Sequence, residues 1–206
     1  MAEHVPAADA TLPPRPRGGK DAIVAVATIR FQRLGYHGTS MRDLARDCEI
    51  TVASIYHHFA SKQEILQDII LRALNDLISE TTAAVEAADD SPREQLAALV
   101  NAWILFHTTR QAEAFVGSTE LRSLDPQGRE VIVALRDRQE AIFRDVIERG
   151  HALGTFQTAF PREATRAIVN MGYSVASWYD PRGELSPQAL ADRYATLALA
   201  TVEAQA

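Results

Sequence analysis

Between residues 39 and 62 the apolar positions follow two short helical periods that are separated by a polar turn. In the first period, apolar residues recur at i, i+3, i+4 and i+7, which is one face of a helix: Met41, Leu44, Ala45 and Cys48. Thr39 or Ser40 supplies a side-chain oxygen that can cap the start of this helix. The pattern therefore predicts a helix over residues 39–48.

The second period begins after Thr51, which can cap a second helix. Its apolar stripe over residues 52–59 consists of Val52, Ile55 and Phe59. Two capped helices this short, joined by a turn of about three residues, are typical of a helix-turn-helix. Such a unit places the N-terminal part of its second helix against DNA base edges, while the first helix crosses the backbone.

The stripe leaves small and polar residues on the other faces of the second helix. Ala53 and Ser54 are small enough to let this helix approach a groove closely. Tyr56, His57 and His58 carry hydrogen-bond donors for phosphates or bases. Each of these three alone is more often an ordinary surface group, but their combination after two capped helix starts indicates DNA binding.

This region resembles the tetracycline-repressor (TetR) family of transcriptional regulators over residues 21 to about 77. The matching positions are Ile23, Ala27, Phe31, Gly35-Tyr36 and residues 39–45, 54–59 and 61–64. The resemblance implies a homodimer whose N-terminal helices bind a palindromic operator. It also implies a C-terminal domain that binds a ligand and thereby releases the DNA.

By position, the resemblance also implies which residues contact DNA. Base or backbone contacts would come from Arg42, Thr51, Val52, Ala53, Ser54, Tyr56, His57 and His58. Lys62, at the start of the following helix, would contact phosphate, and Thr39 would do so from the other side.

Two positions depart from the family's usual motif. Glu49 occupies the turn position that usually holds glycine, and a non-glycine residue at positive φ is uncommon. Val52 stands where a lysine or polar residue is common; it cannot hydrogen-bond a base, although it can touch a thymine methyl group. These departures bear on which operator is recognised and leave the prediction of DNA binding in place.

Beyond the motif, helix starts are marked by caps and prolines. Residues 61–64 and 91–94 have the pattern of capping boxes. Further starts or ends are expected at Asp125-Pro126, Gly150, Pro161, Tyr179 and Ser186-Pro187. Since no alternating β pattern persists, the sequence predicts an all-α fold.

The predicted organisation is a disordered N-terminal tail over residues 1–19, a three-helix DNA-binding domain over residues 20–65 and a helical ligand-binding and dimerisation domain over residues 66–206. The tail has no apolar core like that of a signal peptide. The longest apolar run, residues 96–106, is interrupted by Asn101 and is too short to span a membrane. Cys48, the single cysteine, excludes an internal disulfide and suits the cytoplasm. We therefore expect a cytoplasmic protein without membrane association.

The net charge of -6 is unusual for a DNA-binding protein, but the charge is unevenly distributed along the chain. Residues 1–62 hold eight cations and six anions, so this part carries +2 and the remainder carries -8. Because each neutralised phosphate needs a cation, strong non-specific affinity for DNA is not predicted. Specific binding would depend on a dimer that reads two half-sites.

The last two predicted helices are apolar over a wide arc. Their small and apolar residues are Ala167, Ile168, Met171, Gly172, Val175, Ala176, Leu190, Tyr194, Leu197 and Ala198. Helices of this kind need more than their own chain to cover them, and the resemblance implies a four-helix bundle with their copies across a two-fold axis. The alternative is that they only complete the core of one chain.

A candidate effector cavity is predicted from aromatic and polar residues on the middle helices: Trp103, Phe106, His107, Phe115, Tyr173 and Trp178. Since an aromatic stripe is more often plain core, only one or two of these six are expected to touch ligand. Five arginines are candidates for an anionic ligand portion, although arginines on helices are usually solvated: Arg110, Arg122, Arg129, Arg136 and Arg138.

Residues 150–190 also resemble TetR-type regulators of lipid and steroid catabolism, some of which respond to acyl-CoA thioesters. The combined interpretation is a ligand-responsive repressor that a small hydrophobic or acyl-CoA-like effector releases from a palindromic operator. The effector need only bind the DNA-incompetent shape of the dimer more tightly than the competent one.

Two alternatives remain open. An enzyme is disfavoured because none of the six histidines shows metal-ligand spacing and neither a nucleophile elbow nor a glycine-rich phosphate loop is present, so no metal or cofactor is expected. The other alternative is a helical ligand-binding protein whose operator recognition is weakened or lost, which Glu49 and Val52 leave open.

Overall fold

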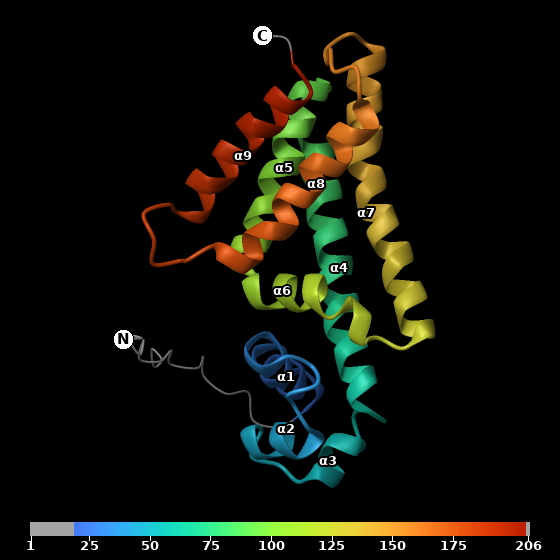
Figure 1. Cartoon of the computed structure of the whole chain (residues 1–206), viewed down its shortest axis with the longest axis vertical. Coiled ribbons are helices and arrows are strands. Elements are labelled where there is room, and N and C mark those ends of the chain that lie inside the picture. The colour runs from blue at the N-terminus through green and yellow to red at the C-terminus, as the bar shows by residue number, and fades with distance from the viewer. Residues whose placement is uncertain (1–18, 205–206) are drawn as a thin grey trace, which may run out of the picture.

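The computed structural model describes residues 19–204, so the predicted tail lies outside the described residues except for Gly19. The described chain is nearly all helical, as predicted, with an isolated bridge between Phe156 and Ala204. Its elements are α1 (Lys20–Leu34), α2 (Met41–Asp47), α3 (Val52–Tyr56), α4 (Lys62–Ala87), α5 (Pro92–Thr109), α6 (Gln111–Thr119), the 3₁₀ turn η1 (Leu121–Ser123), α7 (Pro126–Ala152), α8 (Pro161–Trp178) and α9 (Pro187–Thr201) (Figure 1). Within residues 19–204, no helix is both long and apolar enough to cross a bilayer.

Helices α1, α2 and α3 form a small unit at one end of the molecule (Figure 1). Its core is made of side chains that are at most 1% exposed: Ile23, Ala27, Phe31, Leu44, Ile55 and Phe59. Helices of seven and five residues, such as α2 and α3, are too short to be stable in isolation. Burial of these apolar side chains therefore holds the unit together, at about 1.5–3 kcal/mol for each large one.

Helix α4 connects this unit to the rest of the chain. Its first turns pack against α1, and its later turns pack against α5 and α7. Ser61 caps its start by accepting a hydrogen bond from the amide of Glu64 (3.1 Å). The Glu64 carboxylate accepts from the amide of Ala60 (2.6 Å), one residue before the cap. The continuous helix gives the C-terminal helices a rigid connection to the motif.

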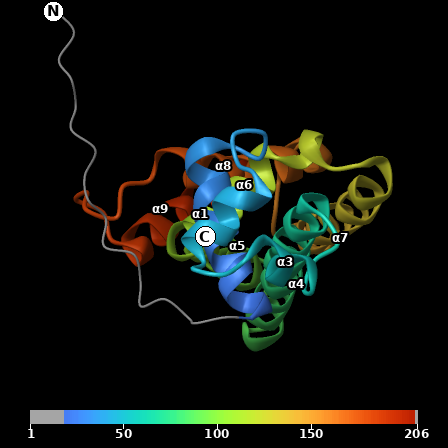
Figure 2. The same cartoon turned by 90° about the horizontal axis from the view of Figure 1, so that it is seen from below.

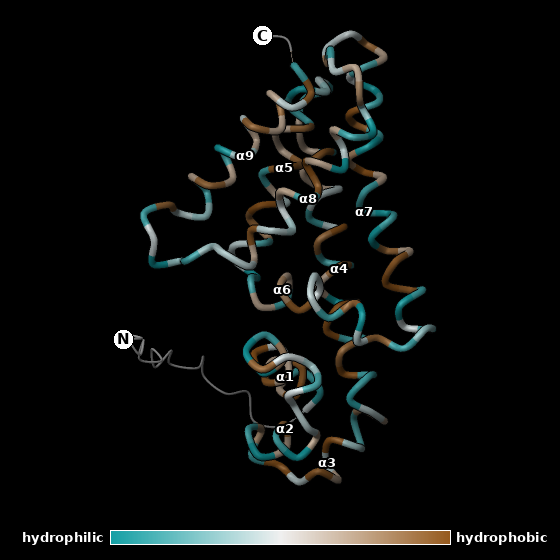
Figure 3. The backbone as a smooth tube through the Cα atoms, viewed as in Figure 1, coloured by the Kyte–Doolittle hydropathy of each residue, from teal (hydrophilic) through white to brown (hydrophobic). Residues whose placement is uncertain are grey.

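Helix α5 forms the centre of the C-terminal helices and packs against α4, α7, α8 and α9. Its Trp103 and Ile104 are fully buried. Helix α9 lies mainly along α5 and makes few contacts with α8 (Figure 1). Helix α7 is amphipathic, and hydrophobic and hydrophilic positions alternate along its tube in Figure 3. The C-terminal core therefore lies between α5 and the helices that surround it.

Three local details differ from the sequence-based predictions. Ser91 is the N-cap of α5 and Pro92 opens the helix, but the Ser91 hydroxyl makes no capping hydrogen bond. Helix α7 continues past the predicted stop at Gly150 and ends at Ala152. The second motif helix ends at Tyr56, three residues before Phe59, because the chain turns at residues 57 and 58.

The wide apolar arc on α8 and α9 is covered in part by this chain itself. Ile168, Val175, Leu190 and Ala198 are buried within the described chain. Leu197 remains 51% exposed, and Ala167 is exposed on α8. Pairing of these helices with a second copy stays a prediction, with Leu197 as the apolar side chain it would cover.

Candidate nucleic-acid interface and effector pocket

Helix α2 is started by a capping box. The Asp43 amide donates to the Ser40 hydroxyl (3.2 Å), and the Ser40 amide donates to the Asp43 carboxylate (3.0 Å). The Ser40 hydroxyl also donates to Asp43 Oδ2 (2.6 Å), and the hydrogen bonds that this carboxylate accepts from the Ser40 hydroxyl and amide lower the pKa of Asp43. Thr39, the other predicted cap, is buried, and its hydroxyl donates to the carbonyl of Gly35 (3.2 Å). Ser40 is therefore the cap, and the Thr39 side chain faces the interior; its contact with phosphate stays a prediction.

Helix α3 is started by Thr51, whose hydroxyl accepts from the Ser54 amide (3.1 Å). The Thr51 and Ser54 hydroxyl oxygens lie 2.8 Å apart, so the two side chains are also hydrogen-bonded to each other. In the turn before the cap, Glu49 has φ of 57°, the left-handed region that usually requires glycine. Glu49 thus adopts the backbone conformation expected for a glycine at this turn position.

The outer surface of α3 carries most of the predicted DNA contacts. Ile55 is fully buried, which fixes the helix against the core. The exposed predicted contacts on and around α3 are Thr51, Ala53, Tyr56, His57 and His58, while Val52 and Ser54 are half-buried. Arg42 is exposed on α2. Figure 2 views the molecule from the end where this surface lies.

The Lys62 side chain contacts the segment between α1 and α2. Its ammonium donates to the carbonyls of Tyr36 (2.7 Å) and Thr39 (2.6 Å) and lies 4.0 Å from the centre of the Tyr36 ring. Burial lowers the pKa of Lys62. The ammonium has three N–H donors, so one is available beyond these two carbonyls. Lys62 therefore joins α4 to the chain between α1 and α2, and its contact with phosphate stays a prediction.

A hydrogen-bonded cluster connects the unit formed by α1, α2 and α3 to α6 and η1. The Tyr36 amide donates to Glu120 Oε1 (3.3 Å), and the Ser123 hydroxyl donates to Glu120 Oε2 (2.6 Å). Gln63 at the start of α4 donates to the Ser123 carbonyl (2.5 Å). We call Tyr36, Lys62, Gln63, Glu120 and Ser123 the interdomain cluster. It ties the end of α1 and the start of α4 to the end of α6.

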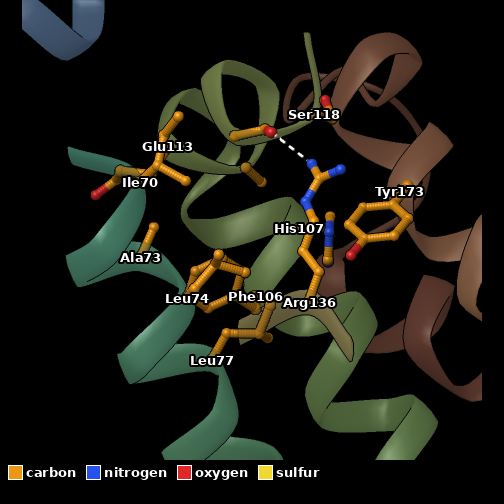
Figure 4. A pocket seen from close by; sticks show the side chains of 12 residues that line it. Ile70, Ala73, Leu74, Leu77, Phe106, His107, Glu113, Ser118, Arg136 and Tyr173 are labelled. Atoms are coloured by element: carbon orange, nitrogen blue, oxygen red, sulfur yellow. Dashed lines mark hydrogen bonds between the residues drawn. The ribbon is translucent and has the colours of Figure 1, made fainter. Parts of the chain in front are cut away.

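The candidate effector pocket lies between α4, α5, α6, α7 and α8 (Figure 4). Its lining residues are Ile70, Ala73, Leu74, Leu77, Phe106, His107, Glu113, Ala114, Gly117, Ser118, Arg136 and Tyr173. The cavity volume is about 20 Å³, whereas pockets for drug-sized ligands measure about 300–1,000 Å³. A ligand of that size would therefore have to push the surrounding helices apart.

The structure brings three of the six predicted effector residues to this pocket: Phe106, His107 and Tyr173. Trp103 lies directly behind them, with ring centres 4.4 Å from His107 and 5.1 Å from Tyr173. Phe115 is half-buried on α6 outside the lining, and Trp178 is 51% exposed at the end of α8. Of the five candidate arginines, only Arg136 lines the pocket.

His107 is a neutral imidazole in the pocket wall. Its side chain is 1% exposed, and burial lowers the pKa of His107 to about 4. Its Nδ1 lies 2.7 Å from the Trp103 carbonyl, so Nδ1 carries the proton and Nε2 is the acceptor nitrogen. The pocket wall at this point is polar and uncharged at neutral pH.

The low pKa of His107 predicts a stability that falls with acidification. In the unfolded chain the imidazole takes up a proton near pH 6.5, whereas in the folded chain it does so only near pH 4. The free energy of unfolding should therefore decrease by up to about 1.4 kcal/mol per pH unit below pH 6.5. Urea unfolding between pH 7 and about 5 measures this slope, a range above the ordinary carboxyl pKa values.

The matched control is His107→Gln, whose side-chain amide keeps a donor for the Trp103 carbonyl. This variant should lose the slope contributed by His107. Equal slopes for the two proteins would contradict the assignment of a neutral buried histidine.

Several residues of the candidate pocket and of the interdomain cluster could not be identified from the sequence. The α4 side chains that line the pocket, Ile70, Leu74 and Leu77, were indistinguishable from other core positions of a long amphipathic helix. Glu120 was also missed, since its partners Tyr36 and Ser123 are known only once α6 is placed against α1. No local sequence pattern marks Glu120, because its role depends on where the short helix α6 packs.

The chain matches two family descriptions that together cover most of its length. Residues 23–69 match "Bacterial regulatory proteins, tetR family", and residues 89–202 match "Tetracyclin repressor-like, C-terminal domain". The transcriptional repressor KstR2 of Mycolicibacterium smegmatis is 26% identical over 91% of this chain and 92% of its own length.

Solved structures give the same result. A regulatory protein of the tetR family from Rhodococcus RHA1 superposes with a TM-score of 0.84 at 30% identity, covering 89% of this chain and 96% of that one. AibR, solved in complex with isovaleryl coenzyme A and operator DNA, has a TM-score of 0.79 over 90% of this chain and 98% of its own, and its 23% identity shows the shared fold alone. With both family descriptions matched and relatives that are regulators, the catalytic alternative is excluded. The chain belongs to the TetR family of bacterial transcriptional regulators.

Proposed function

We propose that this protein is a transcriptional repressor that a small hydrophobic or acyl-CoA-like effector releases from a palindromic operator. The observation that carries the proposal is that α3 is held in place with its outer face exposed. Thr51 caps the helix, and the buried Ile55 fixes it against the core. Its outer surface offers Ala53, Tyr56 and the following histidines to a major groove. Because DNA is the partner, we place the protein in the cytoplasm.

Different parts of this surface would have different tasks on DNA. Val52 and Ala53 at the start of α3 can make apolar contacts with thymine methyl groups. The Ser54 hydroxyl can donate a hydrogen bond to a base if it gives up its hydrogen bond with Thr51. Arg42 on α2 and the exposed Tyr56, His57 and His58 are suited to phosphates. Thr39 and Lys62 would add phosphate contacts, while their hydrogen bonds to the carbonyls of residues 35, 36 and 39 hold the unit together.

Two copies of the chain would read the two halves of the operator. We propose that they pair through α8 and α9, where exposed Leu197 and Ala167 offer apolar and small surface. A two-fold axis through this interface would place the two α3 helices about 34–36 Å apart, one turn of DNA.

The pocket supports the effector part of the proposal. It has an apolar wall from α4 and polar groups from α5, α7 and α8, as small-molecule sites do. AibR was solved with isovaleryl coenzyme A and operator DNA, and its fold is shared by this chain. An acyl-CoA-like effector is therefore the chemistry that we propose.

Helix α6 supplies the connection between pocket and DNA-binding unit. Its Glu113, Ala114, Gly117 and Ser118 line the pocket, and Glu120 directly after it holds the Tyr36 amide. An effector that enlarges the small cavity would displace α6 and strain the interdomain cluster. The effector would bind more tightly to the dimer conformation in which the two α3 helices no longer match the operator half-sites. That conformation would therefore be favoured.

The hydrogen bond between Tyr36 and Glu120 can be tested directly. In Glu120→Ala the Tyr36 amide loses its acceptor, so its hydrogen exchange should speed up by about fivefold, as expected for a loss of about 1 kcal/mol. Glu120→Gln keeps an acceptor oxygen and should exchange more slowly than Glu120→Ala. Amide exchange followed by NMR makes the measurement, and equal rates in all three proteins would show that this bond does not hold the end of α1.

The repressor proposal is tested by operator selection. The wild-type protein is used to enrich binding sequences from a pool of random duplexes, and the affinity for the enriched duplex is compared with that for a scrambled duplex by fluorescence anisotropy. We expect an enriched palindrome that binds at least about 1,000-fold more tightly than the scrambled duplex at physiological salt. If no sequence is enriched, the repressor proposal fails and the chain is a helical ligand-binding protein that has lost operator recognition.

A further inference from the structure

Arg136 is placed in the pocket wall without the partners that an arginine usually has. Its Nη2 donates to the Gly117 carbonyl (2.6 Å), and its guanidinium carbon lies 5.2 Å from the centre of the Tyr173 ring (Figure 4). Its Nε is buried and has no hydrogen-bond partner among residues 19–204. A guanidinium presents its donors in a fixed fork, so an unused buried N–H marks a position for an acceptor atom.

Arg136 also has no carboxylate in contact with it within the described chain. No carboxylate of residues 19–204 forms an ion pair with it, although Glu140 lies one turn further along α7. Glu113, the other charged residue of the lining, accepts from Arg110 (3.3 Å), which also pairs with Asp76 (2.7 Å). The acid in the wall is therefore already paired with a cation, and the guanidinium lacks a carboxylate.

The opposite side of the pocket is apolar. Helix α4 contributes Ile70, Leu74 and Leu77, and α5 contributes Phe106. Figure 4 shows these side chains together on one side, with Arg136 and Tyr173 on the other. A ligand that satisfies both sides has a hydrocarbon part and one end that accepts hydrogen bonds without donating any.

We propose that this pocket takes an acyl compound whose carboxylate or thioester oxygen binds the Arg136 guanidinium and whose chain lies against α4. This inference rests on the proposed function and specifies the chemistry of its effector site. Charge-assisted hydrogen bonds to a guanidinium are about twice as strong as neutral ones, so the head group sets the specificity. An alcohol or an amine with the same chain lacks the acceptor-only end that the fork requires.

The same contact connects the ligand to α6. Arg136 now uses one N–H for the Gly117 carbonyl, which lies three residues before Glu120. A ligand oxygen that binds the unused Nε draws the guanidinium toward the ligand and so weakens its hydrogen bond to this carbonyl. The guanidinium then turns away from α6, and the end of α6 loses a contact close to the interdomain cluster.

The test compares four probes that share a six-carbon chain: hexanoate, hexanoyl-CoA, hexanol and hexylamine. Binding to the full-length protein is measured by calorimetry and by the shift in thermal midpoint. We expect at least one of the two acyl probes to bind about tenfold or more tightly than hexanol, and hexylamine to bind most weakly. Binding of hexanoate alone identifies a free carboxylate as the source of the head group, and binding of hexanoyl-CoA alone identifies a thioester.

Two variants locate the head group. Arg136→Gln should lose the preference for the acyl probe over hexanol, whereas Arg138→Gln, exposed two residues away on α7, should keep it. Equal or tighter binding of hexanol by the wild type, binding of none of the probes, or an unchanged acyl preference in Arg136→Gln would overturn the inference. The comparison of probes on the wild type holds even if Arg136→Gln does not fold.

Operator binding is measured in parallel without any probe. If the wild-type protein showed no preference for an operator sequence, the proposed function would be contradicted, and the results of the probe series would still stand. Failure of the probe series with intact operator binding would contradict only the chemistry assigned to Arg136.

Discussion

Replacing Ala53 with glutamate is expected to weaken operator binding by about 100-fold or more while the fold stays intact. Ala53 is exposed at the second position of α3, where the proposed interface comes closest to the base edges. A glutamate there adds bulk and brings a negative charge toward the phosphates. The same carboxylate lies near the N-terminus of α3, where the helix dipole favours it, so the unit should remain folded.

Ala134→Glu is the matched control. Ala134 is exposed on α7, far along the chain from the motif, and the substitution makes the same change in charge and size. Anisotropy with the enriched duplex should give wild-type affinity for Ala134→Glu. If Ala53→Glu also bound like the wild type, α3 would not be the reading helix.

Replacing Gly172 with alanine is expected to destabilise the protein by about 2–3 kcal/mol. A Cβ atom at this position would lie 1.6 Å from Nε1 and 2.1 Å from Cδ1 of Trp103. Trp103 is fully buried and packs edge-on against Phe143 and Tyr173, with ring centres 5.4 Å and 5.1 Å away. The indole therefore cannot move aside without disturbing the centre of the C-terminal core and the wall of the pocket behind His107.

The control for this substitution is Gly117→Ala on α6. A Cβ atom at Gly117 meets nothing within 4 Å, so alanine fits without a shift. Its higher helix propensity should leave the protein unchanged or more stable by up to about 1 kcal/mol. Urea unfolding compares the three proteins, and a wild-type free energy of unfolding for Gly172→Ala would contradict the close packing of α5 on α8.

The helix-turn-helix could be predicted from the sequence because its information is local. The spacing of Leu44 and Ala45 and the caps at Ser40 and Thr51 lie within one short segment, and the structure confirms each of them. Even the departure at Glu49 was visible, and the structure gives it the positive φ expected at that turn position. Capping and periodicity act within a few residues, so one sequence is enough to detect them.

The pocket was only partly predictable because its members come from five helices. His107 and Tyr173 were candidates for their residue type alone, and the structure brings them together with Arg136. Trp178 was a candidate on the same grounds and lies at the surface. Which aromatic side chains meet depends on how α5, α7 and α8 pack, and this information is spread over the whole C-terminal part.

The interior position of Thr39 and the engagement of Lys62 illustrate a second limit of sequence patterns. Both residues match the family motif, yet their side chains make hydrogen bonds within the DNA-binding unit. A motif match identifies a position and does not reveal whether its side chain binds DNA or holds the binding surface in place.

The most direct test of operator reading by a dimer changes the spacing between operator half-sites. The affinity of the wild-type protein is measured for the enriched palindrome and for the same duplex with five base pairs inserted at its centre. Insertion of about half a DNA turn places the half-sites on opposite faces, so two α3 helices in one dimer cannot reach both. We predict a loss of affinity of about 100-fold or more. Equal affinity for the two duplexes would contradict a dimeric repressor that reads its operator through paired α3 helices.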